Sequence, residues 1–215
     1  MVQSIRALSL AVAFLCAGCT TTFTADTSFP APLVETLPLT VGVYYAEDFQ
    51  THWHRGTNLQ GTKWAVELGP ANVAVFDRLF SVMFEQVAGV TEPELWETPL
   101  GDADAVIAPE LESYRVAMPG DFDDRRYTVW IEYRMRVLGP DGVLIANWLI
   151  DAHGQSLPRG LRHEKSMREA TRLAMRDAAV TVATEFQHQP AIRNWLREKR
   201  NLDHATAHTL NTIAE

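Results

Sequence analysis

Cysteine is nearly absent from this chain. Only two of its 215 residues are cysteine, Cys16 and Cys19, and both lie close to the start. So few thiols exclude a disulfide framework and a cysteine-ligated metal centre in the rest of the chain. That remainder must fold around an ordinary hydrophobic core. Its length and its composition, 47% hydrophobic and 21% charged, permit one.

The apolar run at the start of the chain lacks the length of a transmembrane helix. Ala7–Ala17 is apolar over about eleven residues, whereas a membrane-spanning helix needs roughly 20. The run follows Arg6 and stops at two small residues directly before Cys19. This layout predicts a secretory signal peptide over residues 1–18. Two alternatives are an uncleaved anchor and a soluble secreted protein that is cleaved nearby without acylation.

Positive charge is in short supply, because 19 Lys and Arg stand against 27 Asp and Glu. The formal net charge is −8. A body this acidic does not suit nucleic-acid backbones or electrostatic adhesion to anionic lipid. We therefore expect no nucleic-acid partner, and we expect membrane contact to come through attached acyl chains.

The familiar catalytic motifs are missing. The chain has no G-x-S-x-G, no H-E-x-x-H and no phosphate-cradling glycine loop, and its one C-x-x-C, from Cys16 to Cys19, falls at the end of the predicted signal peptide. We therefore expect a protein that is not an enzyme and that needs no cofactor. Two histidine pairs remain as candidate metal ligands, His52 with His54 on an extended segment and His204 with His208 one helical turn apart. The simpler interpretation is a solvated strand end for His52 and His54 and a polar tail for His204 and His208, so no metal site is assigned.

Three groups of acidic residues are candidates for calcium binding or for acid–base catalysis. Two groups crowd turns but lack the alternation of a calcium-binding loop, and the third shares one face of a predicted strand. The simpler interpretation of each is charge that faces water. The groups are Asp121, Asp123 and Asp124; Asp102 and Asp104; and Glu110 and Glu112.

Hydrophobic periodicity predicts elements in the order β(β)αβββα. Alternating apolar residues predict strands, the first two of which form a long hairpin, and apolar spacings of three and four predict two long helices. Gly139–Gly142, with the sequence GPDG, predicts a tight turn between the last two strands. The predicted strands are 39–46, 62–68, 103–118, 126–137 and 143–153, and the predicted helices are 70–88 and 164–188.

These elements predict a single α+β domain, a mostly antiparallel sheet with two long helices packed on one face. The folded part is predicted over residues 39–200, with a short turn at 191–197 near its end. Residues 19–38 are rich in Thr, Ser and Pro and predict a flexible tether behind the cysteine. Residues 201–215 are predicted to form a polar C-terminal tail.

The sequence around Cys19 resembles the bacterial lipoprotein signal, in which a small residue precedes a cysteine that is lipid-modified and becomes the new N-terminus. The resemblance implies three acyl chains, palmitate among them, on Cys19. Thr20 follows the cysteine, where an Asp would resemble an inner-membrane retention signal. The resemblance therefore implies attachment to the outer membrane, on its periplasmic side.

The domain itself is loosely similar to small periplasmic lipoproteins that assist envelope machines. These include the lipopolysaccharide-assembly lipoprotein and the auxiliary lipoproteins of lipid-transporting ABC systems. The similarity implies an accessory, non-enzymatic role and an envelope protein complex as partner. It rests on VGVYY at 41–45, DAVIAPELESY at 104–114, YRMRVLGPDGVLIANW at 133–148 and AMRDAAVTVATEF at 174–186.

One face of the predicted strand 126–137 carries the best candidate for a docking surface. Trp130, Arg134 and Arg136 fall on its polar side, and Trp148 lies on the neighbouring strand. Tyr, Trp and Arg concentrate binding energy at protein interfaces. An accessory protein that docks onto an envelope complex is therefore favoured. The alternatives are a carrier of lipid or another hydrophobic ligand, a metal-binding periplasmic protein, and a purely structural role.

Overall fold

The computed structural model describes residues 20–61, 63–91, 103–121, 125–158 and 163–213. Their main feature is a five-stranded sheet with the strand order β5-β2-β6-β7-β8. Strand β2 is parallel to both of its neighbours, and the pairs β6–β7 and β7–β8 are antiparallel. The strands are β2 (Leu37–Val43), β5 (Phe84–Gly89), β6 (Ala105–Ala117), β7 (Tyr127–Leu138) and β8 (Leu144–Ser156).

A second, three-stranded sheet has the order β1-β4-β3. Its strands are β1 (Thr21–Thr24), β3 (Trp53–Thr57) and β4 (Lys63–Glu67). Strands β3 and β4 form an antiparallel hairpin, and β1 runs parallel to β4. The helices of the described chain are α2 (Glu47–Gln50), α3 (Gly69–Met83), α5 (His163–Glu185) and α6 (Pro190–Ile213), with a 3-10 turn at Phe186–His188.

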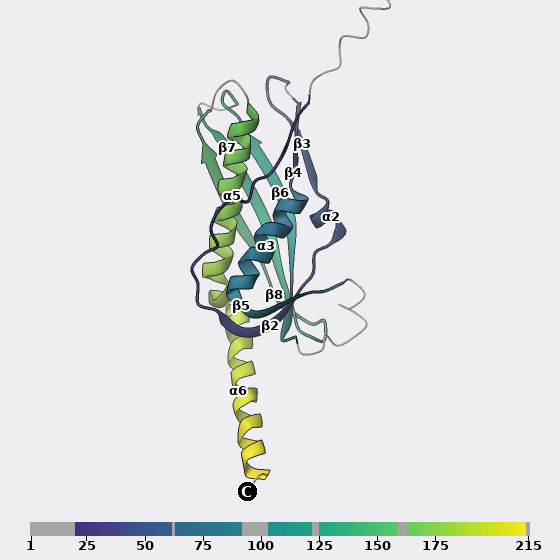
Figure 1. The fold of residues 1–215 in the computed structure, drawn as a ribbon, viewed down its shortest axis with the longest axis vertical. Helices are drawn as coiled ribbons and strands as arrows, with labels where there is room; N and C mark the ends of the chain where they lie inside the picture. The colour runs from purple at the N-terminus through teal and green to yellow at the C-terminus, as the bar shows by residue number, and fades with distance from the viewer. Residues whose placement is uncertain (1–19, 62, 92–102, 122–124, 159–162, 214–215) are drawn as a thin grey trace, which may run out of the picture.

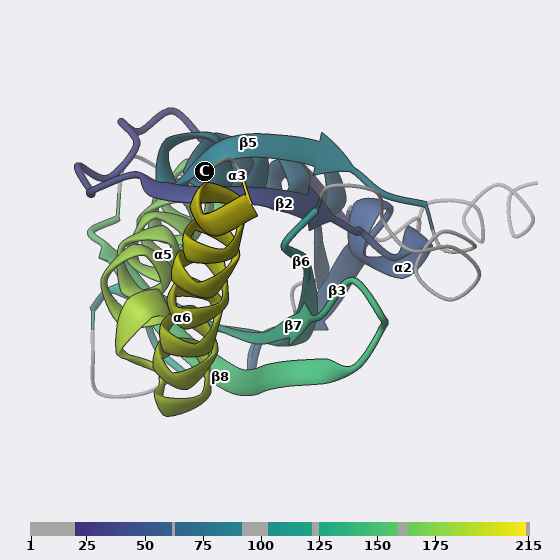
Figure 2. The ribbon, with the colours of Figure 1, turned by 90° about the horizontal axis from the view of Figure 1, so that it is seen from below.

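Helices α3 and α5 lie against one face of the five-stranded sheet (Figure 1). Seen from below, this sheet curls from β5 and β2 through β6 to β8 (Figure 2). The close approach of α5 requires a glycine, because a Cβ on Gly154 of β8 would lie 2.1 Å from the carbonyl oxygen of Ala170. Small residues on α5, among them Ala170 and Ala174, make the matching surface. The predicted fold class, a single α+β domain with two long helices on one sheet face, is confirmed.

The first predicted hairpin and the first predicted helix differ in the structure. The predicted hairpin of 39–46 with 62–68 is wrong, because β4 pairs with β3 and β2 lies in the other sheet. The predicted first helix is too long, because residues 84–89 form β5 and hydrogen-bond to β2. Phe84 and Val87 continue the helical spacing of α3, but pairing with β2 satisfies their backbone groups in an extended conformation.

The predicted turn at 191–197 and the tail at 201–215 are replaced by one helix. Helix α6 begins at Pro190, where proline is well placed, and runs to Ile213. Its first turns are held on the domain by buried Ile192 and by an ion pair of 2.6 Å between Lys199 Nζ and Asp104 Oδ1. The rest of α6 extends past the end of the domain (Figure 1).

The flexible tether predicted for 19–38 is also wrong over the residues that the structure describes. Phe23 in β1 and Phe29 are buried in the core. Arg78 Nη1 donates to the carbonyl oxygens of Thr27, at 2.7 Å, and of Phe29, at 2.9 Å. The physical reason is that two aromatic side chains fill core positions, while the backbone of β1, which carries Phe23, pairs with β4.

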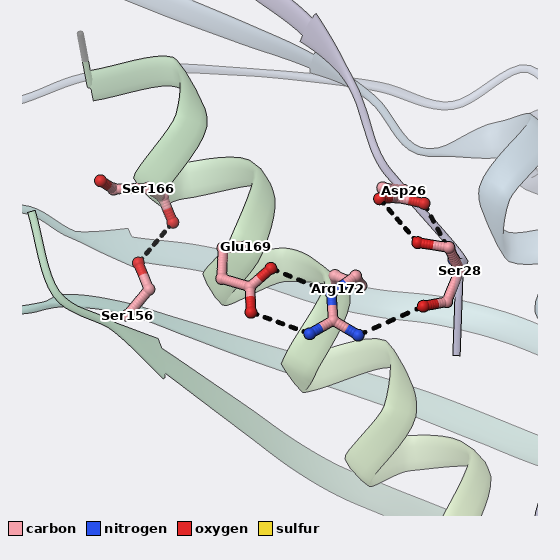
Figure 3. Close-up of polar contacts among 6 residues, drawn as sticks. All are labelled: Asp26, Ser28, Ser156, Ser166, Glu169 and Arg172. Carbon is pink, nitrogen blue, oxygen red and sulfur yellow. Dashed lines mark hydrogen bonds and ion pairs between the residues drawn. The ribbon is translucent and has the colours of Figure 1, made fainter. Parts of the chain in front are cut away.

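Polar contacts fix the same segment to helix α5 (Figure 3). Arg172 holds Glu169 through two hydrogen bonds of 2.8 and 3.0 Å and also donates to the Ser28 carbonyl at 3.3 Å. The Asp26 carboxylate accepts hydrogen bonds from the Ser28 amide and hydroxyl, and these hold the pKa of Asp26 below its ordinary value. The N-terminal segment is therefore part of the domain.

Candidate docking face

Strand β7 has two distinct sides. Its buried residues alternate with half-buried and exposed ones, so that one side faces the helices and the other is not covered by them. We call the uncovered side the open face. On β7 and β8 it carries Trp130, Glu132, Arg134, Arg136, Asn147, Leu149, Asp151, His153 and Gln155.

Two arginines of the open face are neutralised by glutamates of β6. Arg134 pairs with Glu112, and Arg136 Nη1 lies 2.8 Å from Glu110 Oε1. Glu110 and Glu112 share one side of β6 because they are two residues apart, and a bulge between Leu111 and Ser113 then changes the register of the strand. Glu110 and Glu112, weighed from the sequence as a catalytic pair, are therefore ion-pair partners in the structure. All four side chains are about one-third exposed, so each pair contributes at most about 1 kcal/mol.

Trp130 is the exposed aromatic residue of the open face. Trp130 is 37% exposed, and the Arg115 guanidinium lies 6.0 Å from the centroid of the Trp130 ring. This distance is at the limit of a cation–π contact, which orients the ring without hiding it. Trp130 and Arg115 line a groove of about 340 Å³ together with Glu132, Asp151 and His153.

Two acids in this groove face each other across the β7–β8 ladder. Glu132 is directly opposite Asp151, and no ion pair to either is found among the residues that the structure describes. Like charges directly opposite in a sheet are destabilising. His153 does not neutralise them, because its Nδ1 lies 3.4 Å from Asp177 of α5. The groove therefore combines an exposed tryptophan with a net negative charge, since Arg115 is one cation against two carboxylates.

Trp148, predicted to join this surface, lies on the other side of the sheet. It is in register with buried Met135, and its ring packs 6.1 Å from the Phe186 ring. Its indole nitrogen is buried and has no hydrogen-bond partner among the described atoms. The register of the hairpin decides this, because alternate residues of a strand face opposite sides. Trp148 is a core contact rather than part of the open face.

The histidines weighed as metal ligands are partly buried on β3 and just before it. The His54 ring lies 5.5 Å from Trp64 and 5.0 Å from Tyr114, and it stacks 6.3 Å from His52. Burial lowers the pKa of both histidines, and the charge of His52 lowers that of His54 further. Within the described residues, no three His, Cys, Asp or Glu side chains are grouped so that they could hold a metal ion.

The other sequence-predicted residues are placed as follows. Asp104 accepts a hydrogen bond from the Thr40 amide in addition to its pair with Lys199, and Asp121 accepts from the Leu59 and Met118 amides. Asp104 therefore links β2 and α6 to the start of β6, and Asp121 fixes two turns. His204 and His208 lie in α6. Cys19, Asp102, Asp123 and Asp124 lie outside the described residues.

The space between the helices and the sheet is filled by large side chains. Phe76 packs 5.6 Å from Phe80 and 5.2 Å from Tyr133, and Phe84 packs 5.3 Å from Phe186. These rings are almost completely buried. The layer in which a carrier would hold an apolar ligand is therefore occupied by the protein itself.

None of the helices in the part of the chain described here has the length and apolar character needed to cross a membrane.

The fold and this face define a class of protein: an α+β domain whose sheet is covered by helices on one side and open on the other. No protein-family model and no curated protein matches the chain. Among solved structures, it is similar to a Xanthomonas campestris protein described as DUF330, with 13% identity and a TM-score of 0.50 over 76% of this chain and 94% of that one. This likeness shows a shared fold.

Two further solved structures align more weakly. A hypothetical protein of Chlamydia trachomatis has 16% identity and a TM-score of 0.41, over 70% of this chain and 96% of that one. Uncharacterized lipoprotein B of Nitrosomonas europaea has 12% identity and a TM-score of 0.33, over 75% and 94%. Scores this low carry no structural argument.

Sequence reasoning missed part of the groove. It did not single out Arg115, Glu132, Asp151 or His153, although alternation along the last two strands could have placed the three β7 and β8 residues beside Trp130. Arg115 could not be placed in that way. The β6 bulge changes which residues of that strand face outward, and no pattern in the sequence marks it.

Proposed function

We propose that this protein is a lipid-anchored accessory protein of the bacterial cell envelope, held at the outer membrane through Cys19. It is not an enzyme, and it binds a protein partner through the open face. The single observation that carries the docking role is the groove at Trp130, where an exposed aromatic ring adjoins the unpaired acids Glu132 and Asp151. Aromatic anchors with complementary charges are typical of protein interfaces.

The chemistry of the groove indicates the partner's surface. Arg134 and Arg136 beside the groove are paired with glutamates, and Arg115 is one positive charge in the lining against the two carboxylates of Glu132 and Asp151, so the net charge of the groove is negative. We therefore expect the partner to place a lysine or arginine between Glu132 and Asp151 and an apolar side chain against Trp130. A protein surface of this kind also suits an acidic domain that does not bind nucleic acid.

A photo-reactive amino acid placed on the open face tests the docking role in intact cells. At Asn147, on the open face, it should cross-link one dominant protein. At Val180, which is 41% exposed on α5, it should not. Trp130→Ala should weaken the cross-link by the equivalent of about 1–3 kcal/mol, and Glu132→Lys should weaken it further by repelling the partner's cation. Equal cross-linking from both positions, or no effect of either substitution, would contradict the proposal.

The anchor has its own test. Cys19→Ser should abolish labelling by a radioactive fatty acid and release the protein from the membrane fraction, since no other acylation site is proposed. Cys16→Ser is the matched control, because that residue lies within the predicted signal peptide and its replacement should leave labelling unchanged. A Cys19→Ser protein that stays with the membrane would show that the anchor is elsewhere.

A further inference from the structure

The start of β1 lies at one end of the domain together with three connections. These are the β3–β4 turn, the residues after β6 and the residues after β8 (Figure 1). Thr21 is in register with Trp64, and Tyr127 at the start of β7 is in register with Ser156 at the end of β8. The Leu59 amide donates to Asp121 at 3.2 Å, which joins two of the turns. We call this end of the domain the N-terminal end.

Little chain separates this end from the proposed acylation site. Only Thr20 lies between Cys19 and the first residue of β1, so two residue steps can span at most about 7 Å. The segment that follows cannot unravel to give more length without breaking contacts. Phe23 and Phe29 are buried, and Arg78 and Arg172 hold the carbonyl groups between β1 and β2.

Two of the most exposed large apolar side chains in the described chain are at the same end. Leu59 in the β3–β4 turn is 76% exposed, and Leu157 directly after β8 is 66% exposed. Lys63, Arg125 and Lys165, which adjoin the same connections, are exposed as well. Isolated leucines on a surface need no explanation. Here, however, two of them are at the same end of the domain as the start of β1, together with three cations and the Asp121 carboxylate.

We propose that the N-terminal end of the domain lies directly on the lipid headgroup layer, with Leu59 and Leu157 inserted and the cations beside the phosphates. This inference rests on the proposed anchor at Cys19. Helix α5 starts at the N-terminal end, and its 23 residues run along the domain for about 35 Å. The β7–β8 turn and the start of α6 are therefore held at about that height above the membrane, and the open face stands upright.

The test uses the full acylated chain in vesicles of phosphatidylethanolamine and phosphatidylglycerol. Because Cys16 and Cys19 are its only cysteines, a new cysteine can be labelled alone with a fluorophore once the signal peptide has been removed with Cys16 and Cys19 is acylated. Leu59→Cys and Leu157→Cys probe the N-terminal end. Leu144→Cys is the matched control, since Leu144 is also an exposed leucine, at 52%, but begins β8 at the opposite end. Lipids carrying a nitroxide on the headgroup serve as quenchers.

We expect both labels at the N-terminal end to lose most of their fluorescence to the lipid quencher, and the label at position 144 to lose none. If the protein floats with the vesicles but the labels at 59 and 157 stay unquenched, the domain stands away from the membrane. The anchor would then hold and the orientation would be wrong. Quenching at 144 would also overturn the orientation. Failure of the acylated chain to float with the vesicles would overturn the anchor, and this inference with it.

Discussion

Replacing Phe23 by alanine distinguishes a folded N-terminal segment from a tether. Phe23 is 4% exposed and belongs to the main core cluster. Truncation of a buried phenylalanine costs about 3–5 kcal/mol, from lost burial and from the cavity that remains. Because β1 is a short edge strand that can relax into the space, we expect the lower value, a loss of about 3 kcal/mol.

Urea unfolding followed by tryptophan fluorescence measures this loss, and Trp64 on the neighbouring strand is a reporter close to the change. The midpoint should fall while the slope stays constant, because the surface exposed on unfolding is nearly the same. Leu33→Ala is the control. Leu33 follows Phe29 in the same segment but is fully exposed, so its replacement should change stability by less than about 0.5 kcal/mol. Equal effects of Phe23→Ala and Leu33→Ala would refute a folded N-terminal segment.

Three further predictions concern packing, pH and helix α6. Gly154→Ala should destabilise the protein by about 1–3 kcal/mol, because the added Cβ would meet the α5 backbone. Gly89→Ala is the control, since there is open space around Gly89 and its replacement should change thermal stability little. Similar melting temperatures of the two variants would disprove the close contact at Gly154. Burial lowers the pKa of His54, so its stabilising contribution is complete above pH 6.5 and is lost as the pH falls through the lowered value. His54→Phe should therefore flatten part of the stability loss between neutral and mildly acid pH, and an unchanged pH profile would assign that loss elsewhere. Lys199→Met should lower the free energy of unfolding, measured in urea, by at most about 1 kcal/mol and should speed hydrogen exchange at the start of α6. Unchanged exchange would show that the ion pair with Asp104 does not hold the helix.

The sequence predicted best where one local pattern was long. The alternation from Tyr127 to Val137 is confirmed as β7, and it correctly placed Trp130, Arg134 and Arg136 on one side of the strand. A strand of this length with a one-sided hydrophobic pattern has little choice of face. The long apolar stripe of α5 was predicted for the same reason, within one residue at its start.

The errors arose where distant pairing decided the structure. The spacing of Phe84 and Val87 fits a helix, but their backbone pairs with β2 and is therefore a strand. Phe23 and Phe29 are isolated aromatics in a Thr- and Pro-rich segment, so no periodicity marked them as core residues. Trp148 was misplaced because its face depends on the hairpin register, which shifts between Val137 and Leu138. Such features follow from tertiary contacts that a local pattern does not contain.

The position of β2 between two parallel neighbours has a consequence for the order of folding. Strands β6, β7 and β8 are joined by short connections and can pair early, whereas β2 must find β6 across more than sixty residues. The hydrogen bond of the Ser28 carbonyl can form only later still, because its partner Arg172 is 144 residues away in the sequence. The residues synthesised first are thus among the last to reach their places. We expect the segment from β1 to β2 to reach its place on the domain only after α5 has been made.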